Sequence, residues 1–173
     1  MHGGSRIGGR MALLALLQVC CLAAFAFLLV AAGWQDLRTM RIANGLSLAI
    51  VASFVVWAAA GVGLGRLAPV QVGWSLACAA TVLALGTAAF ATGAVGGGDV
   101  KLLAAASLFA GPSHQFDFLA VTAIVGGLLG IAILAGVRIG PSGRSEGVLP
   151  GGLPYGPAIA AGGLWVAASL VTV

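Results

Sequence analysis

Long apolar segments almost without charge recur along this chain, and they constrain its fold more than any other feature. Charged residues make up only 7% of the sequence, whereas soluble domains average roughly 25%. A helix needs about 20 apolar residues to cross the hydrocarbon core of a bilayer. Four segments are near that length or longer: residues 11–34, 46–64, 70–92 and 116–137. The sequence therefore predicts an all-α, polytopic membrane helix bundle.

Two further apolar segments bring the expected number of transmembrane helices to six. The last runs from residue 153 to residue 173. The other, at 100–110, would cover only roughly 17 Å as a helix. It could be a short helix, a helix that continues past the following bend, or a re-entrant segment. The whole chain, 1–173, is expected to form one integral-membrane domain with a polar N-terminal tail at 1–10.

The few acidic residues are informative because a carboxylate near membrane depth is costly and marks function by default. The chain has four, and Asp99 stands between two apolar segments directly after three glycines. If there are six crossings, the loops after the first, third and fifth helices lie on one side. Asp36, where the first helix ends, and Asp99, where the fourth begins, are then expected to meet at one membrane face.

The distribution of Lys and Arg between the two sides predicts which membrane face carries the aspartates. Under six crossings, five lie on the side of the aspartates and three on the other. The positive-inside rule then places the aspartates at the cytoplasmic face and the N-terminus outside. The five are Arg38, Arg41, Lys101, Arg138 and Arg144, and the three are Arg6, Arg10 and Arg66.

Composition also excludes several kinds of site. The basic residues are scattered singly beside apolar segments, which does not suit nucleic-acid binding. Cys20, Cys21 and Cys78 lie inside apolar segments without a C-x-x-C pair, so neither a disulfide framework nor a zinc site is expected. We expect no metal and no cofactor.

Two adjacent carboxyls cannot both ionise easily, so they share a proton. The ionised carboxylate can take a proton from water while the protonated carboxyl polarises a carbonyl, which is aspartyl peptide hydrolysis. The glycines at 96–98 would let an extended substrate backbone approach Asp99. On this steric account, Gly98→Val is expected to nearly abolish cleavage, and Gly162→Ala to matter far less.

Three motifs in order carry a resemblance that covers about residues 30–173. They are Asp-Leu-Arg at 36–38 with Arg-Ile-Ala-Asn at 41–44, then Gly-Gly-Gly-Asp-Val-Lys at 96–101, then Leu-Pro-Tyr-Gly-Pro-Ala at 153–158. The set resembles the type IV prepilin peptidases, a family of membrane aspartyl proteases with a Gly-x-Gly-Asp motif. The resemblance implies Asp36 and Asp99 as the catalytic pair. It also implies a group of substrate-binding or site-shaping residues: Gly96, Gly97, Gly98, Lys101, Arg38, Asn44, Pro154, Tyr155 and Gly156.

The same resemblance implies a location, a substrate and partners. It implies a multi-pass protein of the bacterial inner membrane that removes short leader peptides from prepilin-like proteins at the cytoplasmic face. A prepilin has a short basic leader, and its mature part begins with an apolar helix. The lipid bilayer and the pilus assembly machinery are the other expected partners, with no nucleic acid; the oligomeric state is open.

The chain departs from the family pattern at two points. Ala43 stands where a proline is usual. Nothing matches the N-terminal cytoplasmic region with paired cysteines that longer, methylating members carry. The chain therefore resembles the short form associated with Flp/Tad-type pili, and methyltransferase activity is not expected.

Plainer interpretations stay open for several residues. Asp36 could be an interfacial salt-bridge partner of Arg38 or Arg41, and Lys101 a snorkelling lysine at the membrane edge. Tyr155 and its neighbouring prolines could simply shape the start of a helix. At the level of function, the rivals are a transporter or channel built on glycine-broken helices and a catalytically inactive scaffold of a pilus assembly system.

Overall fold

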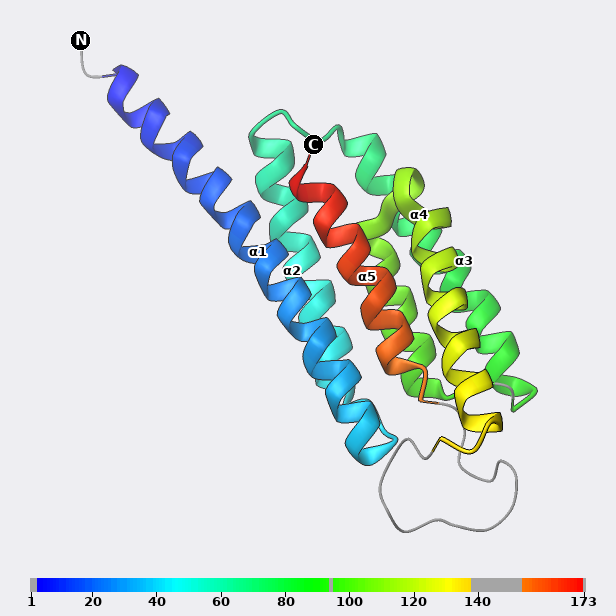
Figure 1. Ribbon diagram of the computed structural model, residues 1–173. Helices are drawn as coiled ribbons and strands as arrows, with labels where there is room; N and C mark the ends of the chain where they lie inside the picture. Colours follow the sequence, from blue (N-terminus) through cyan, green and yellow to red (C-terminus); the bar gives the residue numbers. More distant parts are fainter. Residues whose placement is uncertain (1–2, 94, 138–153, 173) are drawn as a thin grey trace.

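The computed structural model describes residues 3–93, 95–137 and 154–172, and nearly all of them are helical. Figure 1 shows the helices packed lengthwise as one bundle, with α1 extending beyond the others at its N-terminal end. No strand occurs within the described ranges. The helices are α1 (Gly3–Thr39), α2 (Asn44–Gly63), α3 (Pro69–Ala91), α4 (Gly97–Leu134) and α5 (Gly156–Val171).

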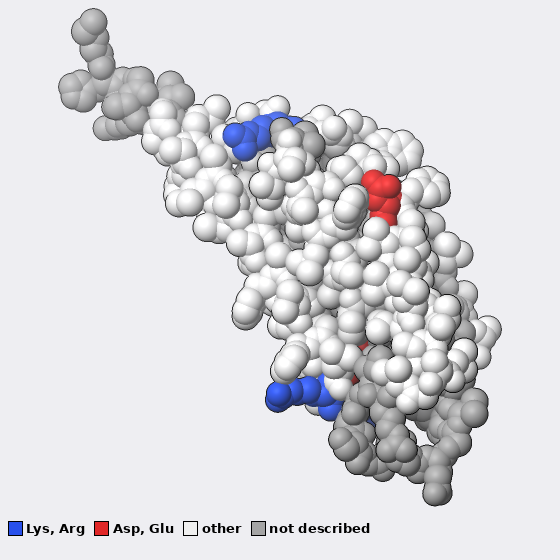
Figure 2. Space-filling model, viewed as in Figure 1, with Lys and Arg blue, Asp and Glu red and all other residues white. Residues whose placement is uncertain are grey.

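The all-α membrane bundle expected from the sequence is confirmed. Helices α1 to α4 are long and apolar enough to cross a membrane, whereas α5 has 16 residues. In Figure 2, Lys and Arg side chains appear at the two ends of the bundle, with an uncharged zone between them. The count of six crossings stays a prediction.

Helix α4 is broken by a sharp bend at Gly111. This residue has φ 53° and ψ −169°, a backbone conformation that is essentially restricted to glycine. Pro112 follows, and proline suits the first turn of a helix because its missing N–H is not needed there. Figure 1 shows the parts before and after the bend running in opposite directions. The segment at 100–110 is therefore a helix that continues past the bend, one of the three possibilities left open by the sequence.

The first part of α4 is the most buried helix of the bundle. Ten consecutive residues from 102 to 111 are all buried except Leu103, which is partly buried. The Phe109 ring stacks on Phe25 of α1 at 4.1 Å between centroids and meets Phe54 of α2 edge-on at 5.4 Å. On its other side, Val100 lies against Gly86 of α3. A helix held from three sides fixes the position of the residues at its start, which include Asp99.

Small residues let α5 pack closely against both neighbours. Gly33 of α1 lies against Pro157, and Gly126 of α4 lies against Tyr155 and Ala158. Gly162 is just as crowded, because a Cβ there would lie 2.7 Å from the Phe118 carbonyl oxygen. This crowding does not support the expectation that Gly162→Ala would matter far less for cleavage than Gly98→Val.

Helix α1 is longer than the apolar segment that predicted it. It begins at Gly3, so residues 3–10 belong to the helix instead of forming a separate tail. It also continues past residue 34, which places Asp36 in its last turn. Propagating a helix costs little once it is nucleated, so polar residues at both ends can extend it. Met40, with φ 52°, ends it in a left-handed conformation.

Ala43 has the backbone conformation of a proline. It precedes α2 with φ −67° and ψ 132°, and proline fixes φ near −65°. No hydrogen bond from its N–H is present among the described residues. The turn therefore keeps the shape that a proline would impose.

We expect Ala43→Pro to be tolerated and to stabilise the protein by about 0.4–1 kcal/mol, because it restricts the unfolded chain without loss of a hydrogen bond. Thermal unfolding in detergent measures the effect. Ala68→Pro is the matched control: its φ of −79° is similar, but its N–H donates to Gln71 Oε1 at 2.8 Å. Destabilisation by Ala43→Pro equal to that by Ala68→Pro would contradict this account of the turn.

Candidate active site

Asp36 and Asp99 lie at the same end of the bundle. Asp36 is near the C-terminal end of α1, and Asp99 is the third residue of α4. Figure 1 shows that α1 and α3 end, and α2, α4 and α5 begin, at this end of the molecule. The two carboxylates are close enough for their charges to interact. Residues 63 positions apart in the sequence are thus brought to one site.

The Asp36 carboxylate is held by the start of α5. Its side chain is only 4% exposed, and Oδ2 accepts a hydrogen bond from the Gly156 N–H at 2.8 Å. Gly156 is the first residue of α5, so this N–H has no partner within its own helix. Such free N–H groups at a helix N-terminus favour an anion.

Glycine is required at position 156 for this contact. A Cβ there would lie 2.6 Å from Asp36 Cβ and 2.8 Å from Oδ2, closer than real contacts allow. The flanking residues fix the backbone: Pro154 is fully buried, and Pro157 lies against Gly33 of α1. The Tyr155 ring covers Gly126 of α4. The segment 154–157 therefore positions the N–H that binds Asp36 and does more than start a helix.

Asp99 is oriented differently from Asp36. Its Oδ2 lies over Gly96, where a Cβ would approach it to 2.7 Å. Its Oδ1 is buried and has no hydrogen-bond partner among the described residues. A buried polar atom without a partner is costly and calls for an explanation. An oxygen left free in this way is available to exchange a proton with a substrate or a water molecule.

The other two glycines of the motif contact the protein itself. A Cβ at Gly98 would lie 3.3 Å from Ile42 Cβ in the α1–α2 turn, and a Cβ at Gly97 would lie 3.3 Å from the Phe90 ring of α3. Neither has a positive φ. The steric account from the sequence is thus corrected: these glycines make room for Ile42 and Phe90, and their conformation is ordinary helix. A loss of cleavage in Gly98→Val could therefore result from a blocked substrate or from disturbed packing against Ile42, and the variant does not distinguish the two.

The polar residues around the aspartates form their own contacts. Lys101 Nζ lies 3.0 Å from Asn44 Oδ1, which links α4 to α2. The Arg38 guanidinium stacks over the Trp34 ring at 4.7 Å. No ion pair joins Asp36 to Arg38 or Arg41 in the described part of the chain. The salt-bridge interpretation of Asp36 is therefore not supported.

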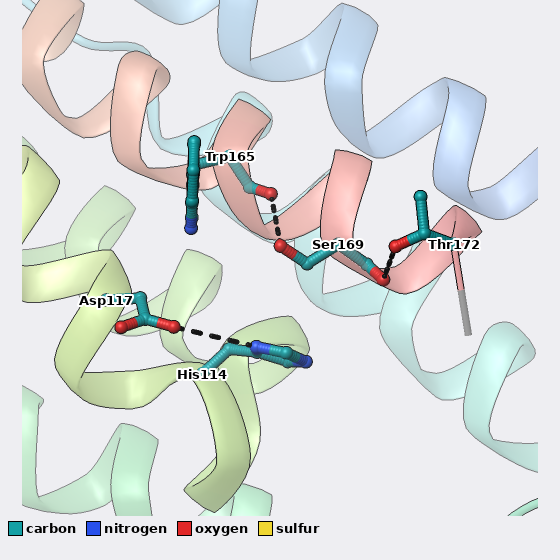
Figure 3. Close-up of polar contacts among 5 residues, drawn as sticks. All are labelled: His114, Asp117, Trp165, Ser169 and Thr172. Carbon is teal, nitrogen blue, oxygen red and sulfur yellow. Dashed lines mark hydrogen bonds and ion pairs between the residues drawn. The ribbon is translucent and has the colours of Figure 1, made fainter.

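The remaining acidic residues lie away from this site or outside the described residues. Asp117 lies 3.9 Å from His114 Nδ1, just past the α4 bend. Figure 3 shows this pair together with Trp165 and Ser169 of the last turns of α5 and with Thr172, which follows the helix, at the opposite end of α5 from Gly156. Glu146, Arg138 and Arg144 fall in the range 138–153, which the structure does not describe.

The donor set of the site does not suit a metal. Within residues 3–93, 95–137 and 154–172, no group of three His, Cys, Asp or Glu side chains could hold an ion. Two carboxyls with a backbone N–H on one of them are suited to proton exchange. The sequence analysis named Gly156 and Gly96 as site-shaping residues, but it did not predict that they contact the Asp36 and Asp99 carboxylates.

Comparison with known proteins identifies a family. The model of the Type IV leader peptidase family matches residues 22–131, a range that includes Asp36 and Asp99 but ends before Gly156. The searches of curated proteins and of solved structures gave no match.

We expect Gly156→Ala to lower the free energy of unfolding by about 1–3 kcal/mol, because the new methyl group overpacks against Asp36. Thermal unfolding in detergent measures the loss, and Gly127→Ala, where a Cβ would meet nothing within 4 Å, is the control. A double-mutant cycle with Asp36→Gly, which removes the clashing side chain, should show a coupling energy of about 0.5–3 kcal/mol. Additive effects would mean that the two residues do not interact as described.

Proposed function

The chain belongs to the type IV leader peptidase family, and on that premise we propose that it is an aspartyl endopeptidase acting through Asp36 and Asp99. The observation that carries the proposal is the pairing, at one end of a membrane bundle, of the buried Asp36 with the partly buried Asp99. One of them accepts a helix N-terminal N–H, and the other has a free oxygen. This asymmetry suits a dyad in which the two carboxyls have different protonation states.

The hydrogen bonds support separate roles for the two residues. Asp36 accepts the Gly156 N–H and acts as the ionised base, whereas Asp99 carries the shared proton on Oδ1. Asp36 takes a proton from a water molecule while the oxygen of that water molecule attacks the scissile carbonyl carbon. Asp99 donates its proton to the carbonyl oxygen. When the tetrahedral intermediate collapses, the amide nitrogen leaves with the proton from Asp36, and Asp99 takes a hydroxyl proton back.

The substrates proposed for this site are prepilin-like proteins of the Flp/Tad type, from which it removes the leader peptide. The protein is an integral membrane protein. We place it in the bacterial inner membrane with the aspartates at the cytoplasmic face. Lys101, Asn44 and Arg38 then lie at the membrane–water boundary, beside the path of the leader. Aspartates at helix ends favour this function over a transporter, whose ion sites lie near mid-membrane.

We expect Asp36→Asn and Asp99→Asn each to lower the rate of leader removal by roughly 10²–10⁴-fold, the usual contribution of an acid–base group. A gel-shift assay of a co-expressed Flp-type prepilin, at matched membrane abundance, measures the rate. Asp117→Asn, at the opposite end of the bundle, is the control and should cleave normally. Near-normal cleavage by either dyad variant would exclude the mechanism, and an inactive parent protein would favour the scaffold alternative.

The orientation can be tested with single cysteines. In a background with Cys20, Cys21 and Cys78 replaced, we expect an impermeant thiol reagent to label Ala68→Cys in intact cells but to label Gly45→Cys only after lysis. Both positions are exposed, and they lie at opposite ends of α2. Labelling of Gly45→Cys from outside would invert the proposed orientation.

A further inference from the structure

Two apolar grooves open on the sides of the bundle, and they differ in their position relative to the aspartates. The first, of about 900 Å³, lies between α1, α2 and α5 and is called here the distal groove. It is lined by Gln18, Ala26, Trp57, Arg66, Leu164 and Val171, among others. The second, of about 450 Å³, lies between α2 and α3 over α4 and is called here the proximal groove. It is lined by Asn44, Leu48, Leu83, Lys101, Ala105 and Leu108, among others.

Only the proximal groove begins at the depth of the catalytic pair. Lys101 at its mouth is two residues beyond Asp99, which is roughly 3 Å along the helix axis. In the distal groove, the α1 residue nearest in sequence to Asp36 is Ala26, ten residues away or roughly 15 Å along the axis. The polar residues of the distal groove, Gln18 and Arg66, join each other at 3.2 Å. That groove therefore cannot present a bound segment to the aspartates.

The proximal groove changes character from its mouth inward. Asn44 and Lys101 lie at the mouth, 3.0 Å apart, whereas the wall beyond them is almost entirely apolar. Its floor on α4 carries alanines at 104 and 105, and small residues let a neighbouring helix approach closely. Ser47 Oγ, in the same wall, is buried and lacks a hydrogen-bond partner among the described residues. From Lys101 to Leu108 the groove accommodates roughly two turns of helix.

We propose that the proximal groove binds the apolar helical segment of the substrate, on the C-terminal side of the scissile bond. This inference rests on the proposed function and specifies where its substrate docks. The change from a polar mouth to an apolar wall fits such an occupant. An apolar helix would pack against the wall, and the extended chain that precedes it would leave past Asn44 and Lys101.

The path from the groove to the aspartates crosses the start of α4. Lys101, Ala105 and Leu108 form one stripe of that helix, whereas Asp99 belongs to the opposite stripe with Leu102, at 3.6 residues per turn. The substrate must therefore pass over Gly97 and Gly98, where Phe90 and Ile42 now lie. Both covering residues can be displaced without breaking a hydrogen bond of their side chains, since neither has a polar side-chain atom.

Site-specific photo-crosslinking tests the docking surface. A benzoylphenylalanine at position 48 or 83 probes the proximal groove, and one at 19 or 164 probes the distal groove; all four native side chains are exposed to a comparable degree, 70%, 44%, 64% and 37%. The experiment uses the full chain with Asp99→Asn and an epitope-tagged Flp-type prepilin, so that the leader stays attached. We expect prepilin crosslinks from 48 and 83 to exceed those from 19 and 164 by roughly tenfold, about 1.4 kcal/mol of site preference.

The outcomes separate this inference from the proposed function. Cleavage of the prepilin by the parent protein, with equal or stronger crosslinks from 19 and 164, would overturn the groove assignment alone. Crosslinks from 48 and 83 to a second copy of this chain would also overturn it. Absence of both cleavage and crosslinks would overturn the function and the docking site together.

A kinetic comparison gives a second, independent measurement. Leu83→Trp narrows the proximal groove, and we expect it to raise KM for the prepilin by roughly tenfold with kcat little changed, because it removes binding shared by ground and transition states. Leu164→Trp narrows the distal groove to a similar degree and should leave KM unchanged. Equal KM values for the two variants would overturn the assignment.

Discussion

The contact between Asp36 and the Gly156 N–H is the constraint on which the rest of this structure depends. A buried carboxylate without a hydrogen-bond partner is very costly, and here its partner comes from 120 residues further along the chain. The contact demands a glycine at 156, a buried proline before it, and a close approach of α1 and α5 at Gly33. The Pro-Tyr-Gly-Pro segment, which the family match does not reach, is thereby tied to the first aspartate.

The second aspartate depends on the burial of a short helix. The first part of α4 is rich in alanine and lies in the interior of the bundle, so that α1, α2 and α3 all contact it. Its modest length follows from the Gly111 bend, which returns the chain to the end it came from. Because the helix is fixed on three sides, Asp99 can keep an unpartnered buried oxygen that a looser element would turn to water.

Much of this could be predicted from the sequence, for identifiable physical reasons. The lengths of the apolar segments predicted the helices. The alternation of loops between the two membrane faces predicted that Asp36 and Asp99 lie at one end. Both predictions need only the positions of apolar segments in the sequence. The roles of Gly97 and Gly98 could not be predicted, since nothing local shows that Ile42 and Phe90 would occupy the space beside them. The same holds for Gly162, whose crowding against Phe118 is a tertiary contact. The backbone of Ala43 shows why a missing proline need not alter its turn.

Ile42 and Phe90 cover Gly98 and Gly97 at the start of α4, next to Asp99, which bears on how hydrolysis could be restricted to suitable substrates. Ile42 belongs to the turn that leads into α2, and Phe90 lies on α3, so both covering residues are on elements that form the walls of the proximal groove. Met40, in the same turn as Ile42, has a left-handed backbone whose strain of roughly 1–3 kcal/mol would favour rearrangement. If the substrate helix moved α2 and α3 apart as it entered the proximal groove, it would uncover Gly97 and Gly98. The hydrogen bond that holds Asp36 joins α1 to α5, so such an opening would leave it in place.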